Sequence, residues 1–528
     1  MKNLKAMQNG RKVVVIGLDG ATFDLIKPWV DEGKLPNLAH LIKNGVWGNL
    51  RSVIPTTSAP AWVSFMTGKN PGKHGIFDFV AHPNTSGGKS CLISSLSFKD
   101  KTLWEILSLH GKRVGVVNVP ITYPPKAVNG FLISCFMTPP SAKVFTYPEE
   151  LRQEIPDYRI DTKYARQLFG MKSEDKSHLL KEQYDITEKR ASAVLRLMDK
   201  WETDFFIVVF KGTDNMQHYF WDRKDILLAY YQRMDGLTAR ILDKSGENTN
   251  VFIISDHGFG PAATKMFFIN AWLEQLWLLK RQANLKSRLF QKVYHMASRI
   301  NEKIKFSRRL PPKSVGVVTA TLNQQVAWTQ TKAYSQTMFG ININLKERDP
   351  YGIVEAGEEY EEIREEIIKE LKNLTDPETD ERIMTGVFKN DEIYWGANLS
   401  KAPDIICVPN PKYSIKNTML FADNIFGNSP TELPGDHRAQ LNGILVAYGP
   451  DIKQGEKIED AQLFDITPTV LHMMGLPIPD DIDGVVLKEI FKEDSEPAKR
   501  DIFYEEEIKD ERKKVKEKIE KLKNLGKL

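Results

Sequence analysis

The feature that most constrains the fold is a series of short apolar runs, each bounded by turn-forming residues. The runs are four to six residues long and rich in Val, Ile and Phe, at 13–18, 114–119, 205–210, 251–254, 405–408 and 444–447. This composition suits strands buried on both faces of a mainly parallel sheet. Helical patterns alternate with them at 101–110, 181–200, 226–242 and 355–374. The alternation predicts an α/β sandwich, because parallel strands are joined by crossover helices that cover the sheet.

The chain has 528 residues, more than the roughly 250–300 at which a single hydrophobic core stops growing. We therefore expect one catalytic domain, formed by residues 12–261 and 400–490, with inserted cap segments. The main insertion, 262–399, contains a basic helical piece, a β-like stretch and an acidic helix. A cap over the strand ends would shape substrate choice, and a surface decoration that only packs is the alternative.

Residues 491–528 form a charged tail that is dense in Glu and Lys towards its end. Four apolar residues there have roughly helical spacing: Ile508, Val515, Ile519 and Leu522. Such a pattern is typical of a solvated helix that docks one thin apolar edge. A contact between the subunits of a homodimer is the alternative interpretation.

The composition excludes several classes of protein. The 73 basic and 69 acidic residues nearly cancel, which leaves no global charge to attract a nucleic acid polymer. The three cysteines are far apart, which argues against a disulfide framework or a thiolate zinc site, and we expect buried, inert thiols. Because no apolar run approaches ~18 residues, we expect a cytoplasmic protein without a membrane segment.

Several apolar runs end in side chains that bind metal ions. Asp19 follows the first run, Asp256 and His257 follow the run at 251–254, and Asp214 and His218 lie just beyond the run at 205–210. In open α/β sheets the binding site lies outside the carboxyl ends of the strands. Asp214 and His218 are four residues apart, so a helical turn places both on one face, where they can share a cation. Each motif alone also has a structural interpretation, such as a helix cap for Asp19.

His437 belongs to the sequence Pro434-Gly435-Asp436-His437-Arg438, which shortly precedes the apolar run at 444–447. Taken alone, this histidine fits best as a structural residue in a loop.

Ser58 is a candidate nucleophile. Pro60 is placed like a first-turn proline and Gly68 like a helix end, so Ser58 should lie just ahead of a helix N-terminus. Free amide donors and the helix dipole favour an alkoxide and a phosphate at that position. The alternatives are that Thr57 is the nucleophile, or that Thr57 or Ser58 merely caps the helix.

Together these motifs resemble a known family. The sequence from Ile16 to Gly20, the segment 55–75, the tetrapeptide Ser255-Asp256-His257-Gly258 and the tripeptide Gly435-Asp436-His437 are similar to the type I phosphodiesterase/nucleotide pyrophosphatase branch of the alkaline phosphatase superfamily. The chain resembles most closely a group of predicted cytoplasmic phosphohydrolases and phosphomutases, over residues 12–490. The resemblance implies an alkaline-phosphatase-like three-layer sandwich.

The resemblance also implies two divalent metal ions and a reaction. One ion would be held by Asp19, Ser58, Asp256 and His257, and the other by Asp214, His218 and His437. These ligands suit Zn²⁺ better than Mn²⁺ or Mg²⁺. The expected activity is hydrolysis of phosphate mono- or diesters of a small soluble substrate through a phosphoseryl intermediate. A phosphomutase or phosphotransferase using the same site is the alternative, and a sulfatase-like hydrolase fits less well because Trp62 stands where sulfatases carry arginine.

The chain departs from the diesterase branch at one position of interest. That branch carries an asparagine shortly after His-Gly-Ile that binds a nonbridging phosphate oxygen, whereas this chain reads His74-Gly75-Ile76-Phe77-Asp78-Phe79. Lys211 and Arg438 are the candidate substrate-binding residues that could replace it. A cation there would favour monoesters, which carry more negative charge than diesters.

Overall fold

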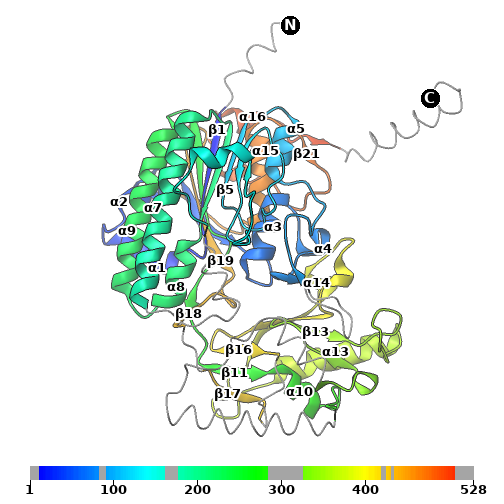
Figure 1. Cartoon of the computed structure of the whole chain (residues 1–528). Coiled ribbons are helices and arrows are strands. Elements are labelled where there is room, and N and C mark those ends of the chain that lie inside the picture. Colours follow the sequence, from blue (N-terminus) through cyan, green and yellow to red (C-terminus); the bar gives the residue numbers. More distant parts are fainter. Residues whose placement is uncertain are drawn as a thin grey trace, which may run out of the picture.

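The computed structural model describes residues 11–81, 91–160, 176–282, 325–417, 424–429 and 433–505. The largest sheet in these ranges has nine strands, in the order β20-β2-β19-β9-β1-β8-β5-β6-β7 (Figure 1). Within this sheet β19 runs antiparallel to both of its neighbours and β7 to β6, whereas the other pairs are parallel. The mainly parallel sheet confirms the predicted fold class. In sheet order, its strands are Glu456–Ile458, Val46–Arg51, Asn442–Tyr448, Thr249–Ile254, Lys12–Leu18, Phe205–Phe210, Val114–Val117, Gly130–Ile133 and Thr146–Tyr147.

Helices cover both faces of this sheet, which gives the three layers (Figure 1). Because successive side chains of a strand point to opposite faces, Val13 and Val15 of β1 join one apolar core, and Val14 and Ile16 join the other. The first core contains residues of α3 (Ser58–Thr67), α5 (Leu103–Leu109) and α15 (Ile466–Met473). The second contains residues of α1 (Phe23–Asp31), α2 (Pro36–Asn44), α7 (Lys176–Lys200), α8 (Gly212–Phe220) and α9 (Lys224–Ser245).

The insertion forms a separate body below the carboxyl edge of the large sheet (Figure 1). It has its own apolar core, around α10 (Ile269–Gln275) and α13 (Glu358–Asn373), and two small sheets. One sheet has the order β12-β13-β15-β14, with strands Ala333–Tyr334, Gly340–Ile343, Ile405–Pro409 and Met384–Lys389. The other has the order β16-β11-β17, with strands Tyr413–Lys416, Lys265–Phe268 and Phe426–Asn428. Most of the predicted basic helical piece, which spans 280–309, lies outside the described residues.

Two sequence-based boundaries differ from these structural units. The apolar run at 405–408 is a strand, but it pairs with β13 and β14 of the insertion, so the insertion's sheets continue past residue 399. The tail also begins later than its composition suggests, because Phe491 is buried and β22 (Tyr504–Glu505) pairs with β21 (Ile478–Pro479). The four apolar tail residues, Ile508 to Leu522, lie outside the described residues.

Two smaller predictions can also be compared with the structure. Cys135 and Cys407 are buried as expected, but Cys91 is exposed, so the expectation of buried thiols is wrong for that residue. Within the described ranges, no helix combines the length and the apolar character that a membrane span requires.

Candidate active site

The candidate site lies at the carboxyl ends of three neighbouring parallel strands. Strand β1 lies between β8 and β9 in register, with Leu18 opposite Phe210 and Gly17 opposite Ile254. The residues that follow these strands therefore meet at one edge of the sheet. They are Asp19 after β1, Lys211, Asp214 and His218 after β8, and Asp256 and His257 after β9.

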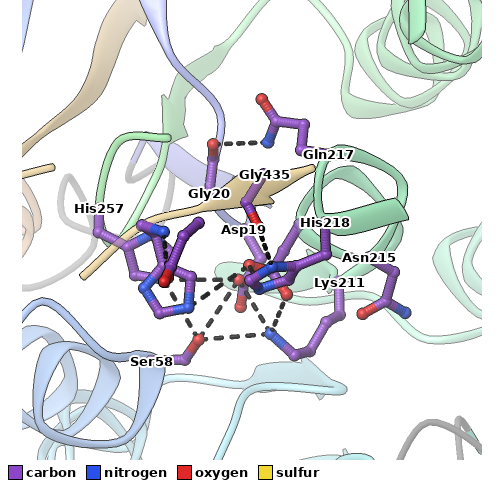
Figure 2. Close-up of polar contacts among 12 residues, drawn as sticks. Asp19, Gly20, Ser58, Lys211, Asn215, Gln217, His218, His257 and Gly435 are labelled. Carbon is purple, nitrogen blue, oxygen red and sulfur yellow. Dashed lines mark hydrogen bonds and ion pairs between the residues drawn. The ribbon is translucent and has the colours of Figure 1, made fainter. Parts of the chain in front are cut away.

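Ser58 joins this group from a different element, as the first residue of α3, and its hydroxyl points towards Asp19 and Lys211 (Figure 2). Its Oγ lies 3.4 Å from Asp19 Oδ1 and 3.4 Å from His257 Nε2, and its side chain is buried. Thr57 is the N-cap of α3, but its hydroxyl makes no capping bond and has no hydrogen-bond partner among the described residues. Of the two candidate nucleophiles, Ser58 is therefore the one that faces the carboxylates and imidazoles.

Lys211 brings a positive charge to the centre of the site. Its Nζ lies 3.1 Å from Asp19 Oδ1, 2.9 Å from Asp214 Oδ2 and 3.3 Å from Ser58 Oγ (Figure 2). The ammonium also lies 5.3 Å from the centroid of the Phe136 ring, a cation–π distance. Arg438, the other cation that we considered, is instead half exposed and pairs with Asp436 at 3.2 Å.

Three histidines are held by the same kind of bond. Nδ1 of His218 lies 2.9 Å from the carbonyl oxygen of Gly435, Nδ1 of His257 lies 2.9 Å from that of Gly258, and Nδ1 of His437 lies 2.7 Å from that of Thr56. A carbonyl oxygen only accepts, so each Nδ1 carries a proton and donates it. Each ring therefore turns Nε2 towards the carboxylates. Metal-binding histidines are commonly oriented by such a backbone bond at the other ring nitrogen.

The Nε2 atoms lie opposite carboxylate oxygens at short distances. His257 Nε2 is 3.3 Å from Asp256 Oδ2, and His218 Nε2 is 3.4 Å from Asp214 Oδ1. Asp256 Oδ2 is buried and accepts no hydrogen bond within the described part of the chain. In the neutral ring, Nε2 and the carboxylate oxygen are both acceptors, and a cation between them satisfies both.

Two groups of ligand atoms are compact enough to hold a metal ion, with all atoms in a group within 4.8 Å of one another. The groups are Asp19, Asp256 and His257, and Asp214, His257 and His437. They differ from the two predicted sets in three respects: His257 belongs to both groups, His218 contacts Asp214 from outside the second group, and Ser58 is not a member of the first, although its Oγ lies 3.4 Å from Asp19 Oδ1. The donors, carboxylates and imidazoles, fit divalent cations such as Zn²⁺.

The electrostatics of the site depend on burial and on the neighbouring charges. Burial, with the nearby carboxylate of Asp256, raises the pKa of Asp19 to about 7. Burial opposes ionisation of Asp214 as well, but the charges of Lys211 and His218 outweigh it and hold the pKa of Asp214 well below its usual value. Burial, with the neighbouring His257, lowers the pKa of His437 well below its usual value. The site therefore favours a neutral His437, and the ammonium of Lys211 only partly offsets the effect of burial and of Asp256 on Asp19.

Sequence reasoning missed several residues that hold the site together. Trp62 Nε1 donates to Asp19 Oδ2 at 3.1 Å, and Thr56 Oγ1 donates to the carbonyl of His437 at 3.0 Å. Gly20 N donates to Asp256 Oδ1 at 3.1 Å. Trp62 lies four residues after Ser58, so the helical spacing could have placed both on one face. The contact between Thr56 and His437 joins distant segments and has no local signal.

Comparison with solved structures identifies the fold. Human ectonucleotide pyrophosphatase/phosphodiesterase 5 is 14% identical, with a TM-score of 0.51 over 88% of this chain and 95% of the other. An inactive form of the murine protein in complex with AMP is 13% identical, with the same TM-score and coverage. At this level of identity the likeness concerns the fold alone, and it agrees with the predicted alkaline-phosphatase-like sandwich around a mainly parallel sheet. No curated protein matches the sequence.

The family follows from a match to the sequence itself. Residues 13–420 match the model of the type I phosphodiesterase/nucleotide pyrophosphatase family. The chain belongs to this family, as its motifs suggested, and it is a phosphoric ester hydrolase.

The raised pKa of Asp19 gives a prediction for the metal-free chain. The pKa is about 7 in the folded state against an ordinary value of 3.8, so the folded state binds this proton more tightly. The contribution of Asp19 to the free energy of unfolding should therefore fall as the pH rises from about 4 to about 7, by an amount on the order of 4 kcal/mol.

Urea unfolding of the wild type and of Asp19→Asn, both in chelator, measures this contribution as the difference between the two free energies. The difference should decline across that pH window and stay constant above it. A difference that does not change with pH would show that Asp19 titrates normally.

Proposed function

We propose that the chain is a two-metal phosphohydrolase that cleaves phosphate esters of a small soluble substrate, with Ser58 as its nucleophile. The observation that carries the proposal is the position of Ser58 Oγ, buried within 3.4 Å of a carboxylate, an imidazole and an ammonium group. A serine that only caps a helix has no need of these neighbours. The absence of a capping bond at Thr57 supports the same interpretation.

The ligand sets that we propose are those implied by the family resemblance. Asp19, Ser58, Asp256 and His257 would hold one cation, and Asp214, His218 and His437 the other, with Zn²⁺ preferred. When bound, such cations supply Lewis acidity that favours the ionised hydroxyl of Ser58 and stabilises negative charge on phosphoryl and leaving oxygens. Three buried carboxylates with Lys211 as a neighbouring cation are consistent with a need for further positive charge.

The residues of the chain then account for the reaction in two steps. Ser58 Oγ attacks phosphorus and the bond between phosphorus and the ester oxygen breaks. The proton lost by the serine hydroxyl goes to the leaving oxygen, so the products are a free alcohol and a phosphoserine at position 58. Water attacks the same phosphorus in the second step and returns a proton to Ser58 Oγ, which restores the serine and releases phosphate from a monoester substrate or the remaining monoester from a diester. The N-terminus of α3, where Ser58 lies, favours the negative charge of both the alkoxide and the phosphoryl group.

Lys211 would take the role that an asparagine has in the diesterase branch. After His74-Gly75-Ile76 this chain has Phe77-Asp78-Phe79, and the ring of Phe79 packs edge-on against Phe136, beneath the ammonium of Lys211. An ammonium 3.3 Å from the nucleophile is placed to bind a nonbridging phosphate oxygen. Its full charge favours monoesters, and the nucleotide monophosphate bound to the murine relative makes nucleotides reasonable members of a test panel.

The test of the nucleophile compares Ser58→Ala with Thr57→Ala in the zinc-loaded protein. Chromogenic phosphate monoesters, diesters and sulfate esters serve as substrates, and released phosphate is measured separately from the alcohol. Ser58→Ala should abolish turnover and the phosphorylated peptide in mass spectra, whereas Thr57→Ala should retain both. Turnover by Ser58→Ala at the wild-type rate would eliminate the serine mechanism. With a monoester as substrate, alcohol released without an equal amount of phosphate would indicate transfer rather than hydrolysis.

The role of Lys211 predicts a change in preference between substrates. Lys211→Met keeps a long apolar stem against Phe136 but removes the charge, so kcat/KM for a monoester should fall about 100- to 1000-fold, the usual effect of losing one oxyanion donor. The loss for a diester should be smaller. Arg438→Gln is the matched control, because that cation pairs with Asp436, and it should change either value less than threefold. Equal losses for both ester types in Lys211→Met would contradict the assignment.

A further inference from the structure

One short segment of the insertion contacts the loop that carries Ser58. It follows α14 (Asn390–Ile393) and runs from Tyr394 to Asn398. The hydroxyl of Tyr394 donates to the carbonyl oxygen of Ile54 at 2.5 Å, and the tyrosine is 2% exposed. Ile54 lies four residues before Ser58. A buried hydrogen bond therefore joins the insertion to the start of the nucleophile loop, residues 54–58.

The nucleophile loop also fixes a predicted metal ligand. Within it, Thr57 N donates to the carbonyl of Pro55 at 2.8 Å, which tightens the turn before Ser58. Thr56 bonds to His437 twice, because it accepts from Nδ1 at 2.7 Å and donates to the His437 carbonyl at 3.0 Å. A shift of this loop would move both Ser58 and the ring of His437.

The ring of Tyr394 is packed among apolar side chains at the junction between the catalytic domain and the insertion. It packs edge-on against Phe77 with ring centroids 5.3 Å apart. Both rings belong to a small apolar cluster that combines Phe77 and Ile54 of the catalytic domain with Phe339 and Ile406 of the insertion. The cluster is separate from the main cores, and its packing joins the insertion to the catalytic domain.

The residues next to Tyr394 fasten the same segment to the catalytic domain. Trp395 Nε1 donates to Asp483 Oδ1 at 2.7 Å, and its carbonyl accepts from Asn70 Nδ2 at 3.0 Å. Asn398 N donates to the carbonyl of Gly72 at 2.8 Å. A Cβ on Gly72 would come within 2.6 Å of the Trp395 carbonyl, so the two backbones lie in close contact. These bonds hold the tyrosine hydroxyl in place over Ile54.

We propose that Tyr394 is a positioning residue for Ser58 and His437, and that the insertion thereby completes the active site instead of only covering it. The inference rests on the proposed function for its kinetic consequence. Loss of the hydroxyl leaves the Ile54 carbonyl without this donor and frees the loop at its first residue. A displacement of about 1 Å at a reacting atom can cost roughly 100-fold in rate.

The test compares Tyr394→Phe with Tyr360→Phe in the full-length, zinc-loaded chain. Tyr360 donates its hydroxyl to Asp404 at 2.9 Å and accepts from Arg364 at 3.1 Å, so the control loses tyrosine hydroxyl bonds that do not contact the nucleophile loop. For Tyr394→Phe we expect kcat to fall at least tenfold while KM changes less than twofold, with a melting temperature close to that of the control. A kcat within twofold of the control would overturn the proposal.

Zinc binding to the same two variants gives a readout that does not depend on turnover. Calorimetry should show weaker binding, by fivefold or more, at one of the two sites in Tyr394→Phe, because His437 is no longer held. If the wild type hydrolyses none of the esters, the proposed function fails. The zinc measurement still tests the positioning role in that case, because equal zinc affinities in Tyr394→Phe and Tyr360→Phe would overturn it.

A second variant covers the case in which Tyr394→Phe does not fold. Phe339→Leu removes part of the apolar packing around Tyr394 on the insertion side and keeps the tyrosine hydroxyl. It should therefore lower kcat threefold or more with KM unchanged. A wild-type kcat in Phe339→Leu, with Tyr394→Phe unfolded, would count against the proposal.

Discussion

The rest of the structure depends on the burial of three carboxylates at one edge of a parallel sheet. Asp19, Asp214 and Asp256 are almost completely buried, and Lys211 is an ammonium among them. Ionised carboxylates are costly in an apolar interior unless cations offset them. The raised pKa of Asp19 reflects this cost. Cations bound beside the three carboxylates would therefore be strongly stabilised. The histidines around the carboxylates already turn Nε2 towards them, so the same cations could be shared by carboxylate and imidazole.

Each side of the fold contributes one part of the site. The three central strands supply the carboxylates, and α3 brings Ser58 from the helical layer on one face of the sheet. The loop that carries His437 follows β18 (Gly435–Asp436), and it is tied to the nucleophile loop through Thr56. The insertion reaches the same loop through Tyr394. The nucleophile loop is thus the point where the insertion, the helix and the metal-ligand loop meet, which is why small changes there should affect chemistry more than stability.

The sequence allowed the fold class and the grouping of the site residues to be predicted because both depend on local patterns. Short apolar runs define buried strands, and parallel strands bring their carboxyl ends together, so Asp19, Asp214 and Asp256 could be expected to meet. Lys211 was proposed only because the family resemblance showed that the asparagine of the diesterase branch is missing. The family resemblance was needed for the ligand sets and for the importance of His437, whose loop looks structural on its own.

Other features could not be predicted because they depend on pairing between distant segments. The run at 405–408 looks like any other buried strand, and only its pairing with β14 assigns it to the insertion. The bond from Tyr394 to Ile54 spans 340 residues. Arg438 looked equivalent to Lys211 in sequence, but its neighbour Asp436 pairs with it at the surface.

The most direct test of the central claim is a crystal structure of the zinc-loaded chain with anomalous scattering measured at the zinc edge. Two peaks about 4 Å apart, one among Asp19, Asp256 and His257 and one among Asp214, His218 and His437, are the predicted result, whereas zinc bound elsewhere or no peak beside Ser58 would contradict it.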